Sequence, residues 1–328
     1  LLLLPIAFGM LLSNLPMIKD SSAIMMHTEF FTNPEYMTDG KYINVGYICQ
    51  HGGLLDLLYL GVKLGIYPPL IFVGIGCMTD FGPLIANPKS ILLGAAAQFG
   101  VFFTFVGALV LSALVPSINF GIKEAASIGI IGGADGPTAI YVTKSLAPAL
   151  LPAIAVAAYS YMALIPVIQP PIMKLMTRKK DRMIVMEQLR PVSKTEKILF
   201  PIIVTIIVAL IIPDAVSLVG CLMLGNLMKE SGVVERLTKM AQNELMNIIT
   251  LFLGVTVGAT ATASSFLSAQ TIGIIVLGLI AFCFSTVGGL FLGDIMCWVT
   301  KGKVNPLIGS AGVSAVPMAA RVSQTVGQ

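Results

Sequence analysis

Charged residues are scarce in this chain, and long apolar runs take their place. Lys, Arg, Asp and Glu make up 11% of the 328 residues, whereas hydrophobic residues make up 56% and mean hydropathy is +0.91. Soluble domains carry about 25% charged residues, so this composition excludes an ordinary soluble enzyme. The sequence predicts an all-α, polytopic membrane protein whose residues 1–328 form a single transmembrane domain in the cell (cytoplasmic) membrane.

Histidine and cysteine are also few. The two histidines, His27 and His51, are far apart in sequence, which argues against a zinc site. The five cysteines show no CxxC spacing, and four of them lie in apolar runs, where cysteine behaves as a small hydrophobic residue. The chain begins at Leu1, inside an apolar run, and we expect both ends to be incomplete.

Positive charge is concentrated in one short segment. Eight of the twenty basic residues lie there: Lys174, Arg178, Lys179, Lys180, Arg182, Arg190, Lys194 and Lys197. By the positive-inside rule, the loop at 176–197 is predicted to face the cytoplasm. The segment is short and lies between two apolar runs, which argues against nucleic-acid binding.

The apolar runs predict membrane spans at 90–115, 149–176 and 271–299, an interrupted apolar segment at 54–78, and the tail of a membrane helix at 1–16. Further apolar runs lie at 198–212, 215–228 and 248–267. We expect the run at 54–78 to be interrupted near its middle, and the span at 149–176 to break at Pro170 and Pro171. Residues 229–247 are amphipathic and predict a helix at the membrane interface or between spans.

Between residues 128 and 148, an acidic residue lies in an apolar run. A carboxylate at membrane depth is costly, so Asp135 needs a partner, a cavity or a proton. Its neighbours disfavour a regular helix: Gly132, Gly133, Gly136 and Pro137. We therefore expect an unwound segment between two half-helices, with bare carbonyls beside the carboxylate. Such oxygens suit a hard cation such as Na⁺. The alternative is a buried structural aspartate that caps the second half-helix.

A second acidic residue repeats part of this pattern. Asp80 lies in Thr79–Pro83, which has the same Asp-x-Gly-Pro spacing as the Asp135 segment. It is either a second ion or proton site or a helix cap, and we favour the cap.

The chain also shows weak internal similarity between residues 54–175 and 198–328. The run 70–74 corresponds to 250–254, and a polar break, a long span and a Gly-rich broken segment follow in both halves. The second broken segment begins near Asn305. Interrupted apolar segments at matching places predict two inverted repeats, whose broken helices meet near the bilayer midplane.

Five motifs carry a resemblance to a known family: Gly132–Tyr141, Ala157–Met162, Ile168–Met173, Asn305–Gly309 and Ala311–Arg321. Together they resemble the β subunit of the biotin-dependent, sodium-pumping decarboxylases, which act on oxaloacetate, glutaconyl-CoA, methylmalonyl-CoA or malonate. The resemblance covers nearly the whole chain. It implies a membrane subunit that decarboxylates carboxybiotin and couples the release of CO₂ to Na⁺ export.

The resemblance also implies roles for individual residues. Asp135, Asn305 and Ser314 are expected to bind Na⁺, and Tyr161 and Arg321 are expected to be catalytic. The planar guanidinium of Arg321 is expected to pair with the carboxylate of carboxybiotin. Each assignment has a plainer alternative. Tyr161 is then a core or interface tyrosine, Ser314 a small packing residue, Arg321 a cytoplasmic anchor and Asn305 a helix cap.

Na⁺ and carboxybiotin are the cofactors that the resemblance implies, and the carboxybiotin arrives on a separate carrier. The implied partners are a carboxyltransferase α subunit, the biotin carrier, a small single-span membrane subunit and further copies of this chain, within a lipid bilayer. The polar loop at 17–53 is longer than we expect for the family, which leaves the subtype open.

A secondary transporter or Na⁺/H⁺ antiporter of similar architecture, with no chemistry, is the competing function. Both proteins would have broken helices around Asp135, so the residues alone do not separate them. The family motifs favour the decarboxylase.

Overall fold

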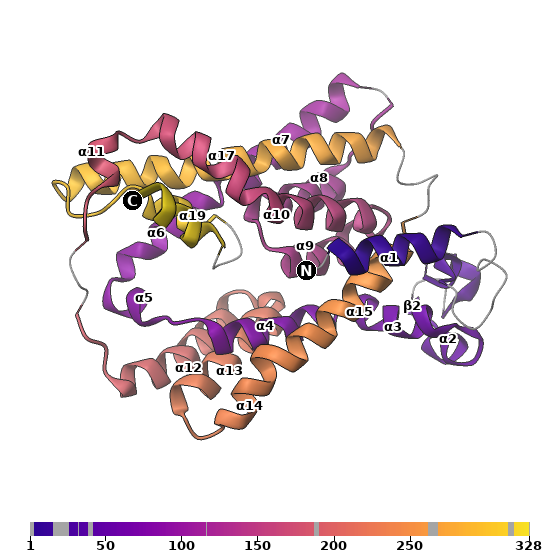
Figure 1. Ribbon diagram of the computed structural model, residues 1–328. Helices are drawn as coiled ribbons and strands as arrows, with labels where there is room; N and C mark the ends of the chain where they lie inside the picture. The colour runs from indigo at the N-terminus through magenta and orange to yellow at the C-terminus, as the bar shows by residue number, and fades with distance from the viewer. Residues whose placement is uncertain are drawn as a thin grey trace. The chain divides into compact units, whose positions relative to one another are not determined.

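The computed structural model describes residues 3–15, 26–31, 33–38, 42–115, 117–186, 190–261, 268–313 and 318–327. These residues are mostly helical, as predicted for an all-α protein (Figure 1). Within them, one small hairpin is present, in which β1 (Met37–Thr38) pairs with β2 (Tyr42–Ile43) in antiparallel register.

Three helical stretches are long and apolar enough to cross a membrane: Pro88–Leu114, Pro148–Met176 and Ala269–Val299. A fourth candidate is the pair α3 (Leu54–Lys63) and α4 (Tyr67–Met78), which is bent by 67° at the interruption expected from the sequence. The described chain is therefore a multi-pass membrane protein, because several apolar helices share one polypeptide.

The chain divides into two compact units that alternate along the sequence. The first comprises residues 1–79, 151–156 and 201–268, and the second comprises 80–150, 157–200 and 269–328. Two of the five divisions fall inside helices, namely α10 (Leu151–Met176) and α12 (Lys194–Ile211).

In the first unit, helices pack through glycines. α4 packs against α13 (Val216–Ser231), and α1 (Leu3–Asn14) packs against α15 (Met246–Ala259) (Figure 1). A side chain at Gly225 would collide with the backbone carbonyl of Val73, so glycine permits close approach of the two helices. The unit also contains these elements: η1 (Thr28–Phe31), η2 (Pro34–Tyr36), α2 (Val45–His51), η6 (Pro213–Ala215), α14 (Glu235–Met240) and the π-helical η7 (Ala241–Leu245).

In the second unit, the long helix α17 (Ala269–Val299) is the centre of the packing. It contacts α7 (Phe99–Leu114), α6 (Ile91–Ala97) and α18 (Ile308–Ala311). The remaining elements are α5 (Gly82–Ala86), η3 (Pro88–Ser90), α8 (Ile122–Gly129), η4 (Ile130–Gly133), α9 (Gly136–Leu146), η5 (Pro148–Leu150), α11 (Lys179–Arg182) and α19 (Met318–Gly327).

Two expectations about helix boundaries need revision. The break predicted at Pro170 and Pro171 is wrong, because α10 continues from Leu151 to Met176 through both prolines and Pro166. Each proline removes only its own N–H donor, and a helix can continue around such local gaps. The amphipathic stretch at 229–247 is not a separate helix. It comprises the end of α13, then α14 and η7, and it leads directly into α15.

Candidate functional site

The predicted unwound segment is present at Asp135. α8 ends at Gly129, a short 3₁₀ turn follows over Ile130–Gly133, and α9 begins at Gly136. Between them, Ala134 has φ +55° and Asp135 is extended with φ −123°. Pro137 lies in the first turn of α9, where its missing N–H costs no helical hydrogen bond. The glycines and the proline therefore break the helix as expected.

Asp135 occupies the position just before α9. Its backbone carbonyl accepts a hydrogen bond from the Ala139 N–H at 3.0 Å, and its Oδ2 accepts one from the Thr138 hydroxyl at 2.5 Å. The positive end of the helix dipole favours a carboxylate at this position. The side chain is half-buried. Asp135 is thus the N-cap residue of α9, but its side chain makes no capping hydrogen bond to the backbone of the first turn of the helix. The arrangement is compatible with a carboxylate that binds a cation.

Neighbouring helices hold the unwound segment closely. The Ser285 hydroxyl of α17 donates to the Gly132 carbonyl at 2.5 Å, with both groups buried. A Cβ at Gly132 would lie 2.7 Å from the Gly100 carbonyl carbon of α7. The absence of a side chain thus lets α7 and α17 fix the path of the broken segment.

Tyr161, the expected catalytic tyrosine, lies against α17. Its ring packs beside Gly278 and Phe282, and its hydroxyl donates a hydrogen bond to the Ile275 carbonyl. The structure therefore gives this hydroxyl a partner within the helix packing.

Tyr159 is a residue that the sequence reasoning did not select. Its side chain is 6% exposed, and its buried hydroxyl has no hydrogen-bond partner within the described part of the chain. Its ring packs on Gly136, where an added Cβ would lie 2.7 Å from the tyrosine hydroxyl oxygen. Tyr159 therefore faces the segment that carries Asp135. The signal was present in the sequence, because Tyr159 belongs to the same motif as Tyr161.

Asn305 lies in the turn before α18. Its Nδ2 donates to the carbonyls of Arg182 at 2.7 Å and Ile184 at 3.0 Å, and its Oδ1 accepts from the Leu307 N–H at 3.0 Å. It thus stabilises its own turn and anchors the basic loop. These hydrogen bonds do not bring it to Asp135.

The remaining predicted site residues are near the C-terminus. Arg321 lies on α19 with its side chain exposed, and Ser314 lies outside the described residues. α19 is tied to α18 by a buried hydrogen bond of 3.0 Å between Ser323 and Ser310.

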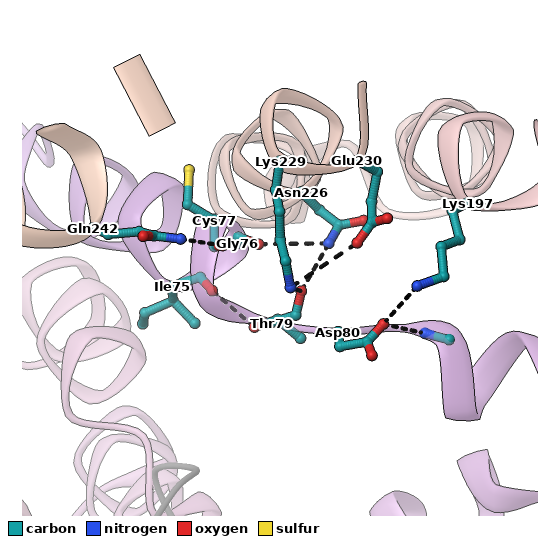
Figure 2. A network of polar contacts seen from close by, with 11 residues as sticks. Ile75, Gly76, Cys77, Thr79, Asp80, Lys197, Asn226, Lys229, Glu230 and Gln242 are labelled. Carbon is teal, nitrogen blue, oxygen red and sulfur yellow. Dashed lines mark hydrogen bonds and ion pairs between the residues drawn. The ribbon is translucent and has the colours of Figure 1, made fainter. Parts of the chain in front are cut away.

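Asp80 agrees with the capping alternative. Its Oδ1 accepts from the Gly82 N–H at 2.9 Å, where α5 begins, and lies 3.3 Å from the Lys197 ammonium (Figure 2). The carboxylate stabilises the polar break after α4 and pairs with the basic loop.

Figure 2 also shows how the last backbone carbonyls of α4 are hydrogen-bonded in the first unit. Lys229 and Asn226 of α13 both donate to the Thr79 carbonyl at 3.0 Å, and Gln242 of η7 donates to the Cys77 carbonyl at 2.6 Å. These donors replace the missing helical partners of the last carbonyls, and the ammonium complements the negative end of the helix dipole.

Comparison with known proteins identifies the family. The family model described as the Na⁺-transporting oxaloacetate decarboxylase beta subunit matches residues 1–328. The chain belongs to this family. It is therefore a beta subunit of the Na⁺-transporting decarboxylases, as the motif resemblance implied.

Curated relatives agree and are similar over the whole chain. The chain is 58% identical to the methylmalonyl-CoA decarboxylase subunit beta of Propionigenium modestum, with 100% of this chain and 80% of the relative covered. It is 54% identical to the glutaconyl-CoA decarboxylase subunit beta of Acidaminococcus fermentans, covering 100% and 78%. It is 51% identical to the oxaloacetate decarboxylase beta chain of Haemophilus ducreyi, covering 100% and 82%.

Proposed function

We propose that this chain decarboxylates carboxybiotin and uses the release of CO₂ to drive Na⁺ export. The observation that carries the proposal is the unwound segment at Asp135, which combines a carboxylate with irregular backbone in the interior of the second unit. Irregular backbone at membrane depth is tolerated where protein buries it or where it lines a cavity. Membership of the Na⁺-transporting family supports this site as the sodium site.

In this proposal, Asp135 supplies the negative charge that balances one Na⁺. Asn305 and Ser314 add neutral oxygen ligands without further charge. The Oδ1 of Asn305 accepts one hydrogen bond from the Leu307 N–H, and a carbonyl oxygen retains a second lone pair for an ion. Because the amide of Asn305 also holds the basic loop, ion binding there would be transmitted to the cytoplasmic side.

Arg321 and Tyr161 carry the chemistry. The exposed guanidinium of Arg321 can be reached by a carrier from outside the membrane, and it pairs bidentately with the carboxylate of carboxybiotin. Decarboxylation breaks the bond between the carboxyl carbon and the ureido nitrogen and leaves the electron pair on nitrogen. That nitrogen then takes a proton, which the phenol of Tyr161 relays. For this step, the Tyr161 hydroxyl must release the Ile275 carbonyl and hydrogen-bond to the ureido nitrogen instead.

Coupling follows from the loss of the carboxylate. Release of CO₂ removes the partner of Arg321, which changes the relative stability of the inward-facing and outward-facing states. A ligand shifts such an equilibrium only through its different affinity for the two states. Export against the membrane potential costs about 2.3 kcal/mol per charge per 100 mV, so the outward state must be favoured only after decarboxylation.

The complex contains further subunits. A carboxyltransferase and a biotin carrier deliver the carboxyl group, as expected for a beta subunit of this family. A small single-span subunit and further copies of this chain complete the assembly, which lies in the cytoplasmic membrane.

The Asp135→Asn variant of the purified complex tests the ion site. The amide keeps the shape of the carboxylate and removes its charge, so Na⁺ binding and Na⁺-dependent turnover should both be abolished. The protein should still insert, because removing a carboxylate at membrane depth relieves about 2.5–3.5 kcal/mol on insertion scales. Normal Na⁺-dependent turnover in this variant would exclude Asp135 as the essential ligand.

A further inference from the structure

The buried hydroxyl of Tyr159 is the starting point for a further assignment. The side chain is 6% exposed, and the hydroxyl oxygen is buried without a hydrogen-bond partner among the residues that the structure describes. Buried polar groups in folded proteins are almost always paired, and an exception calls for a specific explanation, such as an ion or a water molecule at the site. The hydroxyl is therefore a candidate ligand position that the described residues do not satisfy.

The position of the ring shows where this hydroxyl belongs. A Cβ at Gly136 would collide with the Tyr159 ring and would lie 2.7 Å from its hydroxyl oxygen. Gly136 directly follows Asp135 and begins α9. Glycine is thus required at this position for the phenol to approach the backbone of the broken segment. The approach places the unpaired hydroxyl beside the residue that carries the site carboxylate.

The neighbouring tyrosine differs in this respect. The Tyr161 hydroxyl donates a hydrogen bond to the Ile275 carbonyl of α17 and so has a structural partner. Residues two apart on an α-helix are separated by about 200°, because each residue advances by about 100°. The two phenols of the motif therefore leave α10 in nearly opposite directions, one toward α17 and the other toward Gly136.

We infer that the Tyr159 hydroxyl is a ligand of the Na⁺ that Asp135 neutralises. The phenol oxygen contributes a neutral lone pair to the cation, and its proton points away from the ion. The inference rests on the proposed sodium site at Asp135 and adds a residue to it. It also separates the two tyrosines, since Tyr159 binds the ion whereas Tyr161 contacts α17.

Tyr159→Phe in the purified complex tests this assignment, with Tyr161→Phe as the matched control. Equilibrium binding of radioactive Na⁺ is measured without biotin, and thermal unfolding is followed in Na⁺-free buffer. In Tyr159→Phe, the Na⁺ dissociation constant should rise about tenfold, equivalent to about 1.4 kcal/mol. Its unfolding temperature without Na⁺ should be unchanged or higher, because no hydrogen bond is lost and an unpaired buried polar group is removed.

The control should show the opposite pattern. Tyr161→Phe removes the donor to the Ile275 carbonyl, so its unfolding temperature without Na⁺ should fall. Its Na⁺ dissociation constant should stay within about twofold of the wild-type value, below 0.5 kcal/mol by the same conversion.

Three results would overturn the assignment. The first is a Tyr159→Phe dissociation constant within about twofold of wild type. The second is a fall in its Na⁺-free unfolding temperature as large as that of Tyr161→Phe, which would make the hydroxyl a structural donor. The third is loss of Na⁺ affinity in Tyr161→Phe alone.

The Asp135→Asn variant distinguishes failure of the Tyr159 assignment from failure of the proposed function. If Asp135→Asn bound Na⁺ with wild-type affinity, the whole proposed site would be rejected. If Asp135→Asn lost Na⁺ affinity but Tyr159→Phe bound Na⁺ normally, only the role of Tyr159 would be rejected.

Discussion

Single residues of the proposed site perform different tasks, and Arg321 and Asn305 differ most clearly. Arg321 is exposed on α19, where it is available to a carboxylate delivered from outside the membrane. The side chain of Asn305 is engaged within the protein by Arg182, Ile184 and Leu307. In the proposal, the first residue recognises carboxybiotin, and the second connects the ion site with the basic loop.

This division predicts separable defects. Arg321→Gln should impair decarboxylation by at least about tenfold, because it loses a charge-assisted, bidentate contact. Its equilibrium Na⁺ affinity, measured without biotin, should be nearly unchanged. Asn305→Ala should weaken Na⁺ affinity itself. Parallel Na⁺-binding and CO₂-release assays on both variants check the prediction. If Arg321→Gln lost Na⁺ binding as severely as Asp135→Asn, Arg321 would be part of the ion site.

At the scale of elements, the basic loop is held by specific contacts. Arg190 donates to Glu196 at 3.1 and 3.3 Å, and Lys197 pairs with Asp80. The Arg190 guanidinium, followed by the Ser193 N–H, lowers the pKa of Glu196 to about 2. Glu196 therefore stays ionised throughout the physiological pH range, and the contact with Arg190 is retained.

The side of the membrane on which this loop lies is testable at Thr195, which is exposed. A cysteine at Thr195, in a background without the five native cysteines, should react with a membrane-impermeant maleimide only from the cytoplasmic side of sealed vesicles. The same variant in permeabilised vesicles gives the labelling maximum. Labelling from the external side of right-side-out vesicles would reverse the topology and the proposed side of carboxybiotin entry.

The elements also show how far the sequence predicts this structure. The break at Asp135 was predictable, because three glycines and a proline occur within six residues and disfavour a continuous helix. The prediction of a break at Pro170 and Pro171 was wrong, because prolines alone do not end a membrane helix.

The choice between Tyr159 and Tyr161 depends on which face of α10 meets α9 and which meets α17. Sequence spacing separates the two faces but does not identify their neighbours. The contact of His27 with the buried Asp56, at 2.7 Å, was equally unpredictable from the sequence, because the two residues are far apart along the chain.

At the scale of the whole chain, the compact units combine parts of both proposed repeats. The first unit contains residues 54–79 from one repeat and 201–268 from the other, and the second contains 80–150 and 269–328. Corresponding parts of two repeats are thus found in the same unit, which supports the proposal of repeats at 54–175 and 198–328. The unwound segment at Asp135 and the turn at Asn305 both belong to the second unit.

The central claim is that release of CO₂ and movement of Na⁺ are a single coupled process. The most direct measurement uses proteoliposomes that contain the purified complex with the basic loop facing outward. Biotin carrier loaded with radiolabelled carboxybiotin is added outside, and CO₂ release and uptake of radioactive Na⁺ are followed together. The account predicts that CO₂ release requires Na⁺ and is accompanied by Na⁺ accumulation inside, and that both are absent in Asp135→Asn. CO₂ release independent of Na⁺, or Na⁺ uptake driven by a pH gradient without carboxybiotin, would contradict it.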